Sequence, residues 1–137
     1  TLAEREHFHA VYTGVSNKRF ALDEVCRTAD LEPSRVLCVF DDINDLPMVE
    51  HCGVRFQVKR NAGPLFSYYL KENRLCHYQT ANSGGQHAVR ECCELILGMW
   101  GNFKEVVDSR VAFDDSYREY WGIRNQLDTT FSNFKKQ

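Results

Sequence analysis

The feature that most constrains the fold is a short apolar run that ends in acidic residues. Residues 35–40 (Arg-Val-Leu-Cys-Val-Phe) are followed at once by Asp41 and Asp42, and Asp45 comes three residues later. An apolar run of this length is typical of a buried strand. Open α/β sheets build their sites beyond the carboxyl ends of such strands. The pattern therefore predicts an acidic site at a strand end, with the carboxylate chemistry that holds a hard cation such as Mg²⁺.

The rest of the chain predicts alternating strands and helices. The expected strands cover residues 8–12, 36–40, 54–58 and 75–78, and the expected helices begin at Lys18 and cover residues 46–49, 63–71 and 88–100. Residues 1–6 are interpreted as the end of a helix. This alternation indicates an α/β fold, in which a parallel sheet carries helices on both faces through right-handed crossovers.

Composition excludes several classes of protein. With 137 residues and a formal net charge of −2, the chain fits one domain of ordinary size and offers no basic surface for nucleic acid. Its six cysteines lack CxxC spacing, which favours buried free thiols over disulfides or a metal site. No segment reaches the roughly 20 apolar residues of a membrane span. We therefore expect a cytoplasmic protein without membrane contacts.

The C-terminal stretch differs in kind from the rest. From residue 102 to residue 137, aromatic side chains are scattered among charges without a second complete domain. We therefore divide the chain into a domain of residues 1–101 and a tail of residues 102–137. Aromatic residues near helical spacing favour a terminal helix that packs on its own domain. The alternative is an arm that lies across a neighbouring subunit.

The acidic cluster has two interpretations. Asp42 or Asn44 can cap the short helix that follows, and Asp45 can complement the dipole of that helix. Capping explains one acid but not two adjacent acids at a strand end, so a metal or phosphate site is favoured. Lys18 alone is typical of a solvated surface charge, whereas beside carboxylates it would bind phosphate and balance charge.

A pair of glycines precedes the last predicted helix. Gly84 and Gly85 are compatible with a flexible connection or with backbone N–H groups that meet an anion. Arg90 and Glu91 on the helix are interpreted as a local charge pair. The five histidines show no metal-ligand spacing, so none is assigned to a metal.

Together, these segments resemble the haloacid dehalogenase superfamily. More narrowly, they are similar to its minimally capped phosphatases that act on 3-deoxy-D-manno-octulosonate 8-phosphate, and to domains attached to acylneuraminate cytidylyltransferases. The resemblance spans residues 7–107. It is carried by residues 14–18 (Gly-Val-Ser-Asn-Lys), 39–48 (Val-Phe-Asp-Asp-Ile-Asn-Asp-Leu-Pro-Met), 52–54 (Cys-Gly-Val) and 83–91 (Ser-Gly-Gly-Gln-His-Ala-Val-Arg-Glu).

The resemblance implies a role for each predicted site residue. Lys18 would contact the phosphoryl group, Asp41 would bind Mg²⁺, Asp45 would support the metal site, and Asp42 would be the adjacent outer acid. The substrate side of the pocket would be lined by Gly84, Gly85 and Arg90. It also implies a phosphorylated sugar-acid substrate, a Rossmann-like parallel sheet, and a homo-oligomer, a tetramer in the relatives, whose tails reach a neighbouring active site.

Three departures from the family pattern define the alternatives. The Asp-x-Asp motif that supplies the nucleophile is missing, so the resemblance implies the C-terminal part of a phosphatase that lacks its N-terminal strands. Phe40 and His87 stand where relatives carry glycine. The alternative is a catalytically silent relative that serves as an oligomerisation or binding module. A phosphoacceptor receiver domain is disfavoured, because there the acid pair precedes the lysine by most of the domain.

Overall fold

The chain forms two compact units. The computed structural model describes residues 1–61 and 63–134. Residues 16–96 make up one unit, here called the continuous unit, and residues 1–15 join residues from 97 onward in the other, here called the discontinuous unit. The predicted division into residues 1–101 and 102–137 stays a prediction.

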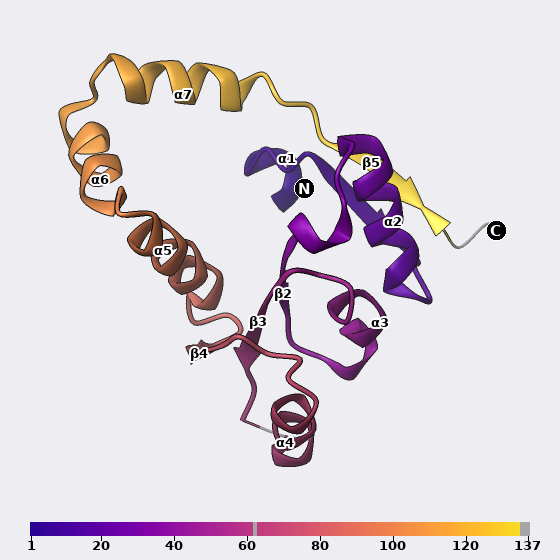
Figure 1. The fold of residues 1–137 in the computed structure, drawn as a ribbon. Coiled ribbons are helices and arrows are strands. Elements are labelled where there is room, and N and C mark those ends of the chain that lie inside the picture. Colours follow the sequence, from indigo (N-terminus) through magenta and orange to yellow (C-terminus); the bar gives the residue numbers. More distant parts are fainter. Residues whose placement is uncertain (62, 135–137) are drawn as a thin grey trace. The chain divides into compact units, whose positions relative to one another are not determined.

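The continuous unit is an α/β structure built on a parallel three-stranded sheet. The strand order is β2-β3-β4, so β3 is central and β2 and β4 are the edge strands (Figure 1). Its elements are α2 (Lys18–Ala29), η1 (Pro33–Arg35), β2 (Leu37–Phe40), η2 (Ile43–Asp45), α3 (Leu46–Val49), β3 (Val54–Lys59), α4 (Pro64–Glu72), β4 (Tyr78–Ser83) and α5 (Ala88–Trp100), whose last residues belong to the discontinuous unit.

Helices cover both faces of this sheet. On the face that carries Cys38 and Phe40, the core is a cluster of buried side chains from the sheet and from α2, α3 and α4. On the opposite face, Phe56 and Tyr78 pack edge to face, and the Tyr78 hydroxyl reaches α5. The core cluster consists of Leu22, Cys26, Cys38, Phe40, Val49, Cys52, Leu70 and Leu75.

Phe40 is part of this core rather than of the acidic loop. Its side chain is only 3% exposed, and Phe40 stands opposite Gln57 in the sheet. Burying a phenylalanine side chain stabilises a fold by about 1.5–3 kcal/mol. The ring of Phe40, which stands where the resemblance expects glycine, therefore packs into the core.

The parallel register brings three connections to one edge of the sheet. Asp41 follows β2, Arg60 follows β3, and Gly84 follows β4. Since the strands run in the same direction, all three residues lie at the carboxyl edge, where open α/β sheets bind their ligands.

The discontinuous unit contains a second, two-stranded parallel sheet. Strand β1 (Ala10–Thr13) pairs with β5 (Thr130–Asn133), and residue Val11 stands opposite Phe131. Helices α1 (Leu2–Arg5), α6 (Phe103–Ala112) and α7 (Asp115–Asn125) complete the unit. The tail therefore contains two helices and a strand, and the strand was not predicted.

The structure corrects one further expectation. The last strand of the continuous unit covers Tyr78–Ser83 rather than residues 75–78. Within the described residues, α1 begins after Thr1, whose side chain caps the helix and forms a capping box with Glu4. The helix that begins at Lys18 is confirmed, with the side chain of Asn17 as its N-cap. All six cysteines are free. Among the described residues, no helix has the length and apolar character of a membrane span.

Gly53, in the connection between α3 and β3, is required by its close approach to the backbone of Ser34 in η1. A Cβ atom at this position would lie 1.8 Å from the backbone oxygen of Ser34. We expect Gly53→Ala to lower the free energy of unfolding by about 1–3 kcal/mol, because the backbone must move to relieve the overlap. Urea denaturation followed by circular dichroism measures this change.

The matched control is Gly98→Ala on α5. A Cβ atom at Gly98 meets no atom within 4 Å, and alanine is favoured over glycine by about 1 kcal/mol in a helix interior. We expect this variant to be at least as stable as the parent. Equal effects of the two substitutions would contradict the packing argument at Gly53.

Candidate functional site

The acidic loop after β2 is organised around one buried carboxylate. Asp45 is 3% exposed, and its Oδ2 accepts the backbone N–H groups of Asp41, at 3.2 Å, and Asp42, at 3.1 Å. Buried carboxylates require such partners, because an unpaired buried charge is strongly unfavourable. Asp45 therefore fixes the backbone of the two residues that follow the strand.

Lys18 is the third hydrogen-bond partner of the Asp45 carboxylate. As the first residue of α2, it donates from Nζ to Oδ1 of Asp45, and the two groups form an ion pair. The lysine side chain remains 45% exposed, whereas that of Asp45 is 5% exposed. The ion pair thus holds a partly accessible ammonium group beside the acidic loop. Four predicted site residues, Lys18, Asp41, Asp42 and Asp45, meet at this one place.

Asp42 caps a helix, which is one of the two roles that the sequence predicted for the acidic cluster. Its side chain is the N-cap of η2, accepting the N–H of Ile43 at 2.8 Å and the side-chain amide of Asn44 at 3.1 Å. Asp41 makes no such cap, and its side chain is 53% exposed. Of the adjacent acids, Asp41 is therefore the one whose carboxylate is available to a ligand.

Arg60 is a further charged residue at the site. Its Nη1 lies 3.4 Å from Oδ1 of Asp42 and donates to the backbone oxygen of Asp41 at 3.4 Å, and its Nε is 3.9 Å from Oδ2 of Asp41. Sequence reasoning missed Arg60. The available signal was its position directly after an alternating strand that neighbours the acidic one.

The glycine turn lies at the same sheet edge, but Arg90 does not join the acidic group. Gly84 and Gly85 follow β4, and Gly84 lies beside Val58 at the end of β3. Arg90 is exposed on α5 and makes no hydrogen bond or ion pair within residues 1–61 and 63–134. The structure thus brings the lysine and the acids together, and it leaves Arg90 without a contact to them.

Glu91 anchors the segment that leads to the glycine turn. Its carboxylate accepts the Tyr78 hydroxyl at 2.5 Å and the backbone N–H groups of Ala81, at 2.7 Å, and Asn82, at 3.0 Å. It also accepts the side-chain amide of Asn82 at 2.8 Å. The interpretation of Arg90 and Glu91 as a charge pair is wrong, because Glu91 bonds to the end of β4 instead.

These hydrogen bonds favour the ionised form of Glu91. The hydroxyl of Tyr78, followed by the N–H groups of Ala81 and Asn82, lowers the pKa of Glu91 to about 2. The same contact raises the pKa of Tyr78, because the phenol donates its proton to the carboxylate. Glu91 is thus a charged clamp between α5 and β4.

The acidic loop is compatible with a magnesium ion that takes one ligand from the protein. No group of three metal-binding side chains is present among the described residues. Magnesium commonly keeps several waters and binds through one or two carboxylates together with substrate phosphates. The exposed carboxylate of Asp41 fits that pattern, whereas Asp45 is already engaged by Lys18 and two backbone amides.

Comparisons with known proteins agree with this geometry. No family model matches the chain. It is 37% identical over 87 residues to the 3-deoxy-D-manno-octulosonate 8-phosphate phosphatase of Yersinia pestis, across 64% of this chain and 43% of that relative. A putative haloacid dehalogenase family hydrolase from Streptomyces avermitilis superimposes with a TM-score of 0.51 at 30% identity, covering 62% of this chain and 48% of the other.

This chain is similar to proteins of the haloacid dehalogenase superfamily.

One solved structure similar to this chain contains ligands. The Moraxella catarrhalis 3-deoxy-D-manno-octulosonate 8-phosphate phosphatase was solved with a magnesium ion, a phosphate ion and the sugar acid. It superimposes with a TM-score of 0.58 at 30% identity, covering 70% of this chain and 51% of that chain. The chain spans about half the length of the curated relatives it matches.

The charge of Glu91 makes a prediction for the pH dependence of stability. Because its pKa is lowered to about 2 in the fold from a usual value of 4.5, its stabilising effect is present above pH 4.5 and is lost as the pH falls toward 2. We expect Glu91→Gln to be less stable than the parent at pH 6, with a difference that shrinks between pH 4.5 and pH 2. Urea denaturation at a series of pH values measures it.

The control is Glu94→Gln on the same helix. Glu94 makes no hydrogen bond or ion pair within the part of the chain that the structure describes. We expect its stability to follow that of the parent at each pH. A difference between the parent and Glu91→Gln that stays constant with pH would contradict the charged clamp.

Proposed function

We propose that this chain is the C-terminal part of a magnesium-dependent phosphatase that hydrolyses a sugar-acid phosphate resembling 3-deoxy-D-manno-octulosonate 8-phosphate. The observation that carries the proposal is the ion pair of Lys18 with buried Asp45, which places an ammonium group beside Asp41 at the carboxyl end of β2. The relatives with the same segments are phosphatases of this substrate, and they support the substrate class.

Each residue of the acidic loop has a defined task in this reaction. The ammonium group of Lys18 contacts the phosphoryl group and offsets its negative charge, while Asp45 fixes the position of the ammonium. Asp41 would hold Mg²⁺, which, when bound, supplies positive charge to the phosphoryl oxygens. Asp42 holds the loop through its cap on η2. Phosphoryl transfer depends mostly on such positioning and charge stabilisation.

The nucleophile belongs to a strand outside this chain. In the proposed reaction, an aspartate carboxylate attacks phosphorus, the bond from phosphorus to the sugar oxygen breaks, and water then hydrolyses the aspartyl-phosphate. The free edge of β2 supports this arrangement, since β2 is an edge strand whose Val39 is 36% exposed. A strand paired there would bring its carboxyl end next to Asp41.

The glycine turn and Arg90 would lie on the substrate side. Gly84 and Gly85 follow β4 at the carboxyl edge, and Glu91 fixes the segment before them. Arg90 is exposed and carries a charge that suits a sugar acid. We also propose a cytoplasmic homo-oligomer, a tetramer as in the relatives implied by the sequence, with the tail of residues 102–137 as the contact region.

A second candidate function is a catalytically silent binding module. Arg60 favours it, because its guanidinium contacts both Asp41 and Asp42 at the place where a metal ion would be bound. A permanent arginine there would substitute for the cation. Under this alternative, the chain binds no magnesium, and Arg60→Gln creates magnesium binding that the parent lacks.

The proposal is tested on the purified protein by two measurements on one sample. Intact mass identifies every polypeptide present, and release of inorganic phosphate from 3-deoxy-D-manno-octulosonate 8-phosphate is followed with Mg²⁺ and with EDTA. Turnover that requires Mg²⁺, in a sample that contains a strand with the Asp-x-Asp motif, supports the phosphatase. A complete sample without turnover supports the silent module.

Magnesium binding by this chain gives a separate prediction. We expect Asp41→Asn to weaken Mg²⁺ binding at least about tenfold, because it removes a ligand charge without changing volume. Calorimetric titration with MgCl₂ measures the affinity, and the circular dichroism spectrum should be unchanged. Asp30→Asn, at the C-cap of α2, is the matched control and should bind as the parent does. Equal affinities of the parent and Asp41→Asn would rule out Asp41 as the ligand.

A further inference from the structure

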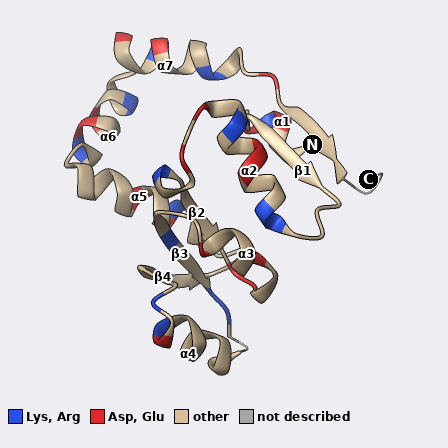
Figure 2. Ribbon diagram, turned by 45° about the vertical axis from the view of Figure 1, so that its right-hand side comes forward, with Lys and Arg blue, Asp and Glu red and all other residues tan. Residues whose placement is uncertain are grey.

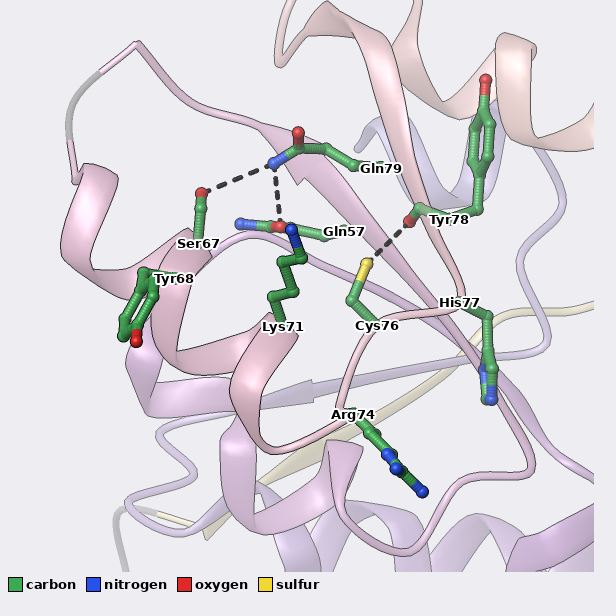
Figure 3. Close-up of a pocket in the computed structure, with 9 residues that line it drawn as sticks. All are labelled: Gln57, Ser67, Tyr68, Lys71, Arg74, Cys76, His77, Tyr78 and Gln79. Atoms are coloured by element: carbon green, nitrogen blue, oxygen red, sulfur yellow. Dashed lines mark hydrogen bonds between the residues drawn. The ribbon is translucent and has the colours of Figure 1, made fainter.

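A polar pocket lies between α4 and β4. It has a volume of about 530 Å³, which is within the range of small-molecule sites. Figure 3 shows the glutamines of the two strands on one side of the pocket and the last turn of α4 on the other. The polar and charged residues that line it include Gln57, Ser67, Lys71, Arg74, His77 and Gln79.

This pocket is separate from the acidic loop. Arg74 and His77 precede β4, so they lie toward the amino edge of the sheet. Asp41 and Arg60 follow β2 and β3, at the carboxyl edge. Because all three strands are parallel, the charged end of the pocket and the acidic loop lie at opposite edges.

The charge of the pocket is positive. Lys71 and Arg74 line it, and none of its lining residues is acidic. The guanidinium of Arg55 adds charge behind His77, with 3.3 Å between its Nη2 and the Nε2 of the imidazole. Its Nε is buried and has no hydrogen-bond partner among the described residues. Figure 2 shows the basic connection that leads from α4 to β4. In a chain with a net charge of −2, this is a local concentration of cations.

Neutral hydrogen-bonding groups occupy the other side of the pocket. Gln57 is 3% exposed, and its amide oxygen accepts Nε2 of Gln79 at 2.9 Å. The same Nε2 lies 3.5 Å from Oγ of Ser67. Amide and hydroxyl groups of this kind both donate and accept, so they suit the hydroxyl groups of a sugar. Gln57 is thus a buried polar group whose hydrogen-bond partner, Gln79, is exposed at the surface.

Arg74 occupies a backbone conformation that favours glycine. Its φ is 52°, in the position after the C-cap of α4, where glycine is the usual residue. Lys71 and Arg74 also complement the dipole at this helix end, but that role needs no arginine in a left-handed conformation.

We propose that this pocket binds a small sugar phosphate, with the phosphate on Lys71 and Arg74 and the sugar hydroxyls on Gln57, Gln79 and Ser67, while both ring nitrogens of His77 face Arg55. Arginine and lysine bind phosphate through charge-assisted hydrogen bonds. The binding site is independent of the acidic loop, and its ligand would act on the domain from a distance rather than as the species that reacts at Lys18.

The test is a titration followed by ¹H–¹⁵N nuclear magnetic resonance with glucose 6-phosphate, inorganic phosphate and glucose as separate probes. We expect glucose 6-phosphate to shift the side-chain amide signals of Gln57 and Gln79. The backbone signals of Asp41 and Asp42 report separately on binding near Lys18. Shifts confined to those two residues, or no shifts at all, would overturn the proposal.

The three probes separate the sources of affinity. We expect glucose 6-phosphate to bind more tightly than either of the other two. If inorganic phosphate binds as tightly as glucose 6-phosphate, the sugar contributes nothing to the affinity. If glucose binds as tightly as glucose 6-phosphate, the phosphate contributes nothing. Either result overturns the proposed ligand class.

Arg74→Gly is the decisive variant. We expect it to weaken the binding of glucose 6-phosphate by about tenfold or more, because a charge-assisted hydrogen bond is lost. Glycine suits the positive φ at this position, so the variant should unfold at the same temperature as the parent or higher. Lys71→Gln should also weaken binding, and Arg35→Gln, an exposed cation on η1 outside the pocket, should not. Unchanged affinity in Arg74→Gly would overturn the role of this residue.

Discussion

The acidic loop depends on the buried carboxylate of Asp45. This group holds two backbone N–H groups of the loop with one oxygen and the ammonium of Lys18 with the other. It thereby links the start of α2 to the end of β2, two segments that are 27 residues apart in the chain. A buried charge with this many partners has one favourable arrangement. The position of every other charged group at the site follows from it.

A second carboxylate acts in a comparable way at the end of β4. Glu91 holds Ala81 and Asn82 through their backbone N–H groups, just as Asp45 holds Asp41 and Asp42. In both places, an acid from a following helical segment binds the backbone that leaves a parallel strand. The carboxyl edge of the sheet is therefore built from fixed loops, although loops at such edges carry few backbone hydrogen bonds of their own.

The sequence allowed the sheet, its helices and the meeting of Lys18 with the acids to be predicted, because these follow from apolar periodicity and from motif order. It did not reveal Arg60 or Glu91, since their contacts join residues that are distant in the chain and carry no local pattern. Strand β4 was placed too early, because the apolar residues before it belong to the core under α4. Strand β5 has little apolar alternation, and only its pairing with β1 makes it a strand.

The pairing of β1 with β5 also has a consequence for the order in which the chain folds. Val11 and Phe131 stand opposite each other across 120 residues, whereas every strand of the continuous unit pairs with the next strand in sequence. Contacts between distant residues form slowly, because a long loop must close first. The continuous unit can therefore fold during synthesis, while β1 has no partner from this sheet until residues 130–133 have left the ribosome.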